Sequence, residues 1–151
     1  MKYYAYLILF LIINFGSLAI GMLLMDNGPR ADWYLSLNKA PWTPPGWVFG
    51  ATWSFIMVCF SFYLATLFTK HLNKAVKVAF TLQVVLNISW NYVFFNQHLV
   101  LLGFINLLLL NVLLCFFFFS QSQGKYKFLL LPYMIWMCIA TSLNLYILIH
   151  N

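Results

Sequence analysis

The chain has 151 residues, 64% of them hydrophobic and only 7% charged, with a formal net charge of +6. A soluble domain carries about 25% charged residues, so this composition excludes a soluble protein and predicts an integral membrane protein. The apolar runs are continuous rather than alternating, which argues against a transmembrane barrel and predicts an all-α membrane protein.

Five apolar segments predict five transmembrane helices, because a spanning helix needs about 20 apolar residues. We place these helices at residues 3–25, 44–68, 76–95, 99–119 and 128–149, in one domain covering 1–151. The first segment is longer than the apolar region of a signal peptide and lacks a cleavage site, so we expect it to be retained. The turn after the third helix is so short that the third and fourth helices form an antiparallel hairpin.

The loop between the first and second helices has the most distinctive composition. The stretch Trp33 to Trp53 holds four of the six tryptophans and three of the five prolines. Proline fixes φ and has no backbone N–H, so this stretch is stiff. We expect Thr43 to cap the second helix, with proline in its first turn. The stretch is interpreted as a rigid aromatic lid over the bundle, or alternatively as a rigid loop with tryptophans at the membrane interface.

The basic residues predict the orientation in the membrane. With five crossings, six basic residues fall on the N-terminal side: Lys2, Lys70, Lys74, Lys77, Lys125 and Lys127. The other side holds Arg30 and Lys39, which are offset by Asp26 and Asp32. The positive-inside rule then places the N-terminus in the cytoplasm, and the first loop and the C-terminus outside. Basic residues at segment ends suit membrane topology better than nucleic-acid binding.

The membrane-embedded parts of the segments contain no Asp, Glu, Lys or Arg. This argues against an ion-driven transporter and against the residue sets of a hydrolase, and no metal-ligand spacing occurs. We expect Asn14 to face a neighbouring helix, and Ser17 and Gly21 to form a small pair that allows close helix contact. The three cysteines each lie in an apolar segment and are interpreted as buried thiols.

Several amides, hydroxyls and indoles remain within the segments. Asn87 and Asn91 share one face of the third helix beside Trp90, because they are four residues apart. The others are Asn106 and Asn111 on the fourth helix, and Trp136, Thr141, Ser142 and Asn144 on the fifth. One interpretation is hydrogen-bond glue between helices, which contributes about 0.6–2 kcal/mol per contact. The other is an apolar pocket with a few oriented amides and indole walls, suited to a flat hydrophobic ligand.

Three blocks of sequence resemble the translocator protein family, also called tryptophan-rich sensory proteins or peripheral-type benzodiazepine receptors. The first block is Trp33-Tyr34-x-x-Leu37-x-Lys39-x-Pro41-Trp42-x-Pro44-Pro45-Gly46-Trp47-Val48-Phe49-Gly50-x-x-Trp53. The second is Leu86-Asn87-x-x-Trp90-x-x-x-Phe94-Phe95, and the third is Leu131-Pro132-Tyr133-x-x-Trp136-x-x-x-Ala140-Thr141-x-Leu143-Asn144. The resemblance covers nearly the whole chain in the family's order, and the short tail resembles bacterial members, which predicts a bacterial cell membrane.

The resemblance implies a bundle of five helices, often dimeric, with a ligand cavity under the first loop. It implies a membrane receptor or carrier for porphyrin or haem-pathway tetrapyrroles, for sterols in some members, and for benzodiazepine-type drugs. No cofactor is required, and the expected partners are membrane lipid, such a ligand and a second copy of the chain. Carried over by position, the cavity residues are Trp47, Phe49, Trp53, Asn87, Trp90, Asn91, Trp136, Ala140 and Leu143.

Two alternatives remain open at this point. Trp53 and Trp136 match tryptophans linked in some bacterial relatives to light- and oxygen-dependent porphyrin breakdown, so a degradative enzyme is one alternative. A regulatory membrane partner without a ligand is the other. The chain also departs from the family's pattern: Ala40, Ala51 and Asn106 stand where relatives often have proline, proline and an acid. The proposed sterol motif lacks its terminal cation here, which lowers the expectation of sterol binding.

Overall fold

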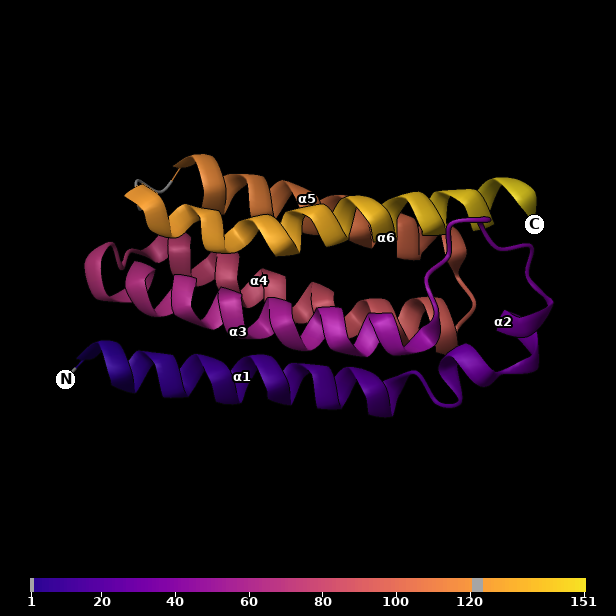
Figure 1. The fold of residues 1–151 in the computed structure, drawn as a ribbon, viewed down its shortest axis with the longest axis horizontal. Coiled ribbons are helices and arrows are strands. Elements are labelled where there is room, and N and C mark those ends of the chain that lie inside the picture. The colour runs from indigo at the N-terminus through magenta and orange to yellow at the C-terminus, as the bar shows by residue number, and fades with distance from the viewer. Residues whose placement is uncertain (1, 121–123) are drawn as a thin grey trace.

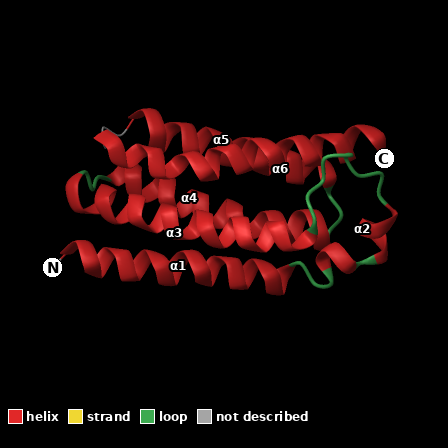
Figure 2. Ribbon diagram, viewed as in Figure 1, coloured by secondary structure: helices red, strands yellow, loops and turns green. Residues whose placement is uncertain are grey.

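The computed structural model describes residues 2–120 and 124–151, and within these ranges it contains helices and loops but no strand (Figures 1 and 2). The elements are α1 (Lys2–Leu24), η1 (Gly28–Arg30), α2 (Asp32–Ser36), α3 (Gly46–Lys70), α4 (Lys74–Asn91), η2 (Tyr92–Asn96), α5 (Val100–Ser120), η3 (Gly124–Leu130) and α6 (Leu131–His150). In this described part of the chain, five helical segments are long and apolar enough to cross a membrane. The predicted class, a membrane bundle of five helices, is confirmed.

The helix boundaries agree with the predicted ones to within a few residues, with additions. The predicted first loop contains the short helices η1 and α2. A single π-helical turn, η2, extends α4, and the 3-10 helix η3 precedes α6. Residues 121–123 of the predicted polar turn before the last helix lie outside the described residues.

The prediction that Thr43 caps the second helix is wrong. α3 begins at Gly46 with Pro45 at the N-cap position, and no side chain caps it. A residue before proline avoids the helical region, so the successive prolines Pro44 and Pro45 keep the chain extended beyond Thr43. The Thr43 hydroxyl instead donates a hydrogen bond to the Ala40 carbonyl oxygen at 2.7 Å.

The helices lie side by side along one long axis, and the two termini lie at opposite ends (Figure 1). α1 packs against α3 and α4, and α5 packs against α4 and α6. As predicted, Asn14 faces a neighbouring helix: its Nδ2 donates to Ser61 Oγ at 2.9 Å. Gly21 is buried, and a methyl group added there would lie 2.6 Å from Asn91 Nδ2. A side chain at this position would therefore have to displace the Asn91 amide at the contact between α1 and α4.

The interpretation of the cysteines as buried thiols is wrong for two of them. Cys115 and Cys138 are exposed on the outside of the bundle, and Cys59 is half-buried. Because lipid is as apolar as a protein core, a membrane helix tolerates a thiol on either face. An apolar run therefore does not predict which of its residues face the bundle.

Candidate functional site

The loop of residues 25–45, called the cap below, crosses the bundle end that holds the C-terminus (Figure 1). One side of the cap rests on the junction of η2 and α5. The Trp33 ring stacks on His98 with centroids 4.0 Å apart and meets Phe94 edge-on at 5.6 Å. Tyr34 contacts Phe94 and Phe95 at 6.3 and 5.3 Å. These aromatic contacts hold the first half of the cap against the bundle.

The other side of the cap rests on the end of α6. Trp42 Nε1 donates to Ser142 Oγ at 3.2 Å, and its ring contacts Tyr146 at 5.5 Å. The Asn38 backbone N–H donates to Asn151 Oδ1 at 2.8 Å, and Asn151 Nδ2 donates to the Asn38 carbonyl oxygen at 3.2 Å. The cap is thus attached to two separate helices before it enters α3, as the lid interpretation predicts.

Below the cap, aromatic rings from α3 meet those of α6. Phe49 contacts Trp136 edge-on at 5.2 Å, and Trp53 contacts Tyr133 edge-on at 5.7 Å. Deeper in the bundle, Gln83 Nε2 of α4 donates to the Tyr133 hydroxyl at 2.9 Å. The predicted residues Phe49, Trp53 and Trp136 therefore lie together between α3 and α6.

The remaining predicted residues lie in different surroundings. Trp90 stacks on Phe94 with ring centroids 5.1 Å apart. Trp90 and the half-buried Ala140 both pack against the hydrophobic core that contains Trp136. The side chains of Asn87 and Leu143 are buried. Asn91 is turned toward α1, because its Nδ2 is the atom that a methyl group at Gly21 would meet. Trp47 is 75% exposed on the outside of α3, away from the other predicted residues.

Several buried polar atoms in this interior have no hydrogen-bond partner among the described residues. They are Trp90 Nε1, Trp136 Nε1, Asn106 Oδ1, Gln83 Oε1, and both Nδ2 and Oδ1 of Asn144. Burying such an atom without a partner costs about 1–3 kcal/mol, so native proteins retain few of them. Sequence reasoning placed Trp90 and Trp136 in the site and left Asn144 open as either a structural or a ligand-binding amide. It missed Gln83, and it included Tyr133 only as a position of the third sequence block.

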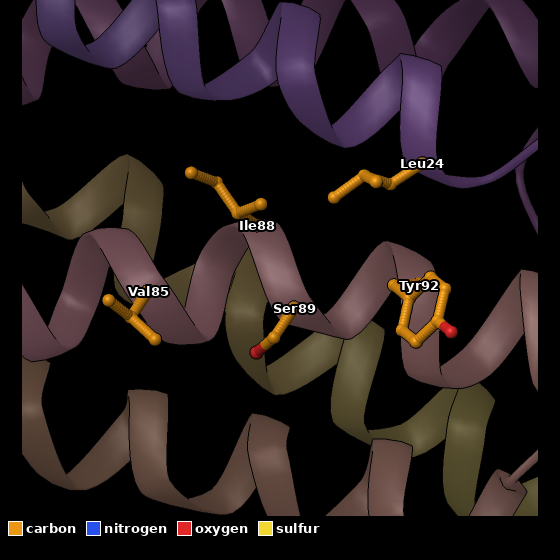
Figure 3. Close-up of a pocket in the computed structure, with 5 residues that line it drawn as sticks. All are labelled: Leu24, Val85, Ile88, Ser89 and Tyr92. Carbon is orange, nitrogen blue, oxygen red and sulfur yellow. The ribbon is translucent and has the colours of Figure 1, made fainter.

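Two pockets lie on the outer face of α4, and Figure 3 shows the residues that line the larger one. The larger, of about 390 Å³, lies between the end of α1 and α4 and is lined by Leu24, Val85, Ile88, Ser89 and Tyr92. The smaller, of about 230 Å³, lies between α4 and α5. Neither is lined by a predicted site residue, so the cavity under the cap stays a prediction.

The site offers hydrogen-bonding groups in an apolar, aromatic environment. Within the described residues, no group of three His, Cys, Asp or Glu side chains gathers closely enough to hold a metal ion. The available polar atoms below the cap are indole N–H groups and amides in an apolar, aromatic environment. In the cap itself, burial raises the pKa of the Tyr34 hydroxyl. Such a site suits a flat hydrophobic molecule that carries a few hydrogen-bonding groups.

Comparison with known proteins gives a family for this architecture. The sequence profile of the TspO/MBR family matches residues 7–150. A tryptophan-rich protein TspO from Chlorobaculum tepidum is 31% identical over 129 residues, which cover 82% of this chain and 82% of the relative. The TspO protein of Archaeoglobus fulgidus is 30% identical, covering 79% and 80% of the two chains. The translocator protein of Ovis aries is 30% identical, covering 78% and 74%.

Proposed function

This chain belongs to the TspO/MBR family, and we propose that it is a receptor or carrier that binds porphyrin-type tetrapyrroles and similar hydrophobic ligands beneath the cap. The family membership and the five apolar helices make it an integral membrane protein. Relatives are named tryptophan-rich sensory protein and translocator protein. The tetrapyrrole class comes from the resemblance of the three sequence blocks, and the site chemistry supports it.

The observation that carries the proposal is the pair of unpartnered indole N–H groups below the cap. Trp90 Nε1 and Trp136 Nε1 are both buried and lack an acceptor among the described residues. An indole N–H can only donate, so each needs an acceptor that the surrounding side chains do not supply. The ring faces nearby provide a surface for stacking. A planar molecule with acceptor groups would satisfy both requirements.

The proposal is tested by titrating protoporphyrin IX into detergent-purified protein in the dark and following tryptophan fluorescence. We expect the ligand to quench the tryptophan fluorescence in a saturable way. This quenching should be weaker in Trp136→Phe and in Trp53→Phe, because the Trp136 and Trp53 rings lie between α3 and α6. Trp47→Phe is the matched control, because Trp47 is exposed on the outside of α3 and should not change the affinity. Absence of saturable quenching in the wild-type protein would overturn the proposed function.

We also propose that the N-terminus faces the cytoplasm and the cap faces outward. Lys2, Lys70 and Lys74 lie at helix ends remote from the cap (Figure 1). The proposal is tested with a variant lacking the three native cysteines and carrying one cysteine, at Asn38 or at Lys125. A membrane-impermeant maleimide added to intact cells should label the Asn38→Cys protein, and the Lys125→Cys protein only after lysis. The reverse pattern would invert the topology.

A further inference from the structure

We propose that Asn144 determines ligand specificity by binding a carboxylic acid group of the ligand in its neutral form. This inference rests on the proposed function, because it names the ligand group that the site beneath the cap selects. Asn144 lies on α6 and is 2% exposed, and neither Nδ2 nor Oδ1 has a partner among the described residues. Within residues 2–120 and 124–151, it is the one side chain with both a buried donor and a buried acceptor unused.

Three other asparagines of the bundle interior show what structural use of an amide looks like. Asn14 Nδ2 donates to Ser61 Oγ across α1 and α3 at 2.9 Å. Asn111 Nδ2 donates to Thr141 Oγ1 across α5 and α6 at 3.0 Å, and Asn106 Nδ2 donates to Ser89 Oγ at 2.9 Å. Each of these amides links two helices. Asn144 makes no such link, so hydrogen-bond glue between helices does not account for it.

The fold makes room for the Asn144 side chain at a glycine of α5. A methyl group added at Gly103 would lie 3.3 Å from Asn144 Nδ2 and 3.3 Å from two carbons of Phe94. The bare backbone at Gly103 therefore leaves space that the amide and the Phe94 ring fill together. Phe94 in turn stacks on Trp90, whose Nε1 is also unpartnered. Phe94 thus connects two residues with unused polar atoms: it stacks on Trp90 and approaches Gly103 together with Asn144.

The charge of the surroundings decides the form of the ligand group. The spanning windows of α4, α5 and α6 hold at most two charged residues each, and the Lys residues of these helices lie at the end remote from the cap. A carboxylate buried without a cation is strongly disfavoured, so a carboxyl group here is protonated. The acid O–H then donates to Oδ1, and the acid carbonyl oxygen accepts from Nδ2. One neutral carboxyl group satisfies both atoms of the amide.

Access to Asn144 runs through the cap. Phe94 and Asn144 both approach Gly103, and Phe94 also contacts Trp33 and Tyr34 of the cap at 5.6 and 6.3 Å. When the cap lifts, Phe94 loses both of these neighbours and can rotate away from Gly103. The amide is then open to a ligand entering from the cap end. Closing the cap restores the ring and excludes water from the acid–amide pair.

The test compares protoporphyrin IX with its dimethyl ester, which lacks the acid O–H. We expect Asn144→Leu, which is similar in size and apolar, to weaken binding of the free acid about tenfold and of the ester less than twofold. Because it removes two unpartnered buried atoms, this variant should keep or raise the melting temperature. Asn111→Leu is the matched control: it breaks the bond to Thr141 and should lower the melting temperature with equal effects on the two ligands.

Three outcomes are distinguishable in the same experiment. If Asn144→Leu weakens the acid and the ester equally, or melts earlier as Asn111→Leu does, Asn144 is structural and the inference is overturned. If wild-type protein and Asn144→Leu bind both ligands alike, the inference fails while the proposed function stands. If wild-type protein binds neither ligand, the proposed function itself fails. Should the leucine variant not fold, Asn144→Ala is measured with the same two ligands and read by the same criteria.

Discussion

The two ends of the bundle use the same five helices differently. At the end remote from the cap, the hydroxyl groups inside the bundle have partners: Tyr63 donates to the Phe117 carbonyl oxygen at 2.7 Å, and Thr66 to the Phe62 carbonyl oxygen at 3.1 Å. At the cap end, Trp90, Trp136 and Asn144 retain polar atoms without partners in the described residues. Gln83 Oε1 is also unpartnered but lies deeper, where Gln83 reaches Tyr133. Unmet polar groups cost stability, so their larger number toward the cap fits the proposed binding site there.

Packing shows the same difference between the two ends. Phe10, Phe60 and Phe80 are buried at the remote end, and Phe10 meets Phe80 edge-on at 5.1 Å. At the cap end, Phe49 and Trp53 are only half-buried, although they lie on the same helix as Phe60. A tightly packed core resists change in volume, whereas half-buried rings can move to admit a guest. The ends are therefore expected to respond differently to the same kind of substitution.

The largest expected effect is from Phe60→Ala in the packed end. The Phe60 ring is fully buried and contacts Tyr133, Phe117 and Phe80. Removing a buried phenylalanine leaves a cavity and costs about 3–5 kcal/mol. We expect a large fall in the melting temperature in detergent, with unchanged protoporphyrin affinity of the protein that remains folded. A loss of affinity without a loss of stability would contradict the division between the two ends.

A smaller effect is expected from Ser61→Ala, which leaves the α3 backbone unchanged. The substitution removes the acceptor of Asn14 Nδ2 and leaves a buried donor unpaired between α1 and α3. The cost is about 1–3 kcal/mol. The double variant Asn14→Leu with Ser61→Ala is the control, since it removes both partners and should recover part of the loss. Equal melting temperatures for wild type and Ser61→Ala would mean that this bond does not stabilise the helix pair.

The sequence was sufficient for the bundle because a membrane requires continuous apolar runs, and those runs mark the five helices. It was not sufficient for the cap contacts. Trp42 meets Ser142 across 100 residues of sequence, and no local pattern encodes such a pair. It also failed at Thr43, where the two following prolines overrode the capping preference.

The site residues divide in the same way. The sequence blocks identified Trp90 and Trp136, whose ring type alone marks them. The third block contains Asn144, but the sequence could not assign its role, because an amide is functional or structural according to whether a neighbouring helix offers it a partner. That depends on Gly103 and Phe94, which approach it only in the folded bundle.

A modest effect is expected at the cap from Trp42→Phe. This change removes the bond to Ser142 Oγ but keeps the aromatic contact with Tyr146. A hydrogen bond at an exposed position contributes about 0.5–1 kcal/mol, so ligand dissociation should quicken about twofold to fivefold. Ser142→Ala removes the same bond from the other side and should give the same rate, with no further change in the double variant. Stopped-flow displacement of bound protoporphyrin measures these rates. If the effects of Trp42→Phe and Ser142→Ala add in the double variant, the bond between Trp42 and Ser142 does not hold the cap.

The smallest effect at neutral pH is expected from Tyr34→Phe, whose consequence appears only in alkaline solution. Burial raises the pKa of the Tyr34 hydroxyl above its value of about 10 in an unfolded chain. Lys39 Nζ lies 4.8 Å from the centre of the Tyr34 ring and is the cation that faces it.

The pKa of the Tyr34 hydroxyl is higher in the folded protein than in the unfolded chain. The contribution of the neutral hydroxyl to folding stability is therefore complete below about pH 10 and is lost as the pH rises through the folded pKa. Ionisation then favours release of Tyr34 from Phe94 and Phe95, which frees one side of the cap. Ligand dissociation should therefore quicken as the pH rises above about 10 in the wild-type protein, and less in Tyr34→Phe. Identical pH profiles for the wild-type protein and Tyr34→Phe would mean that Tyr34 does not hold the cap closed. Trp33 and Trp42 would then be the residues that attach the cap.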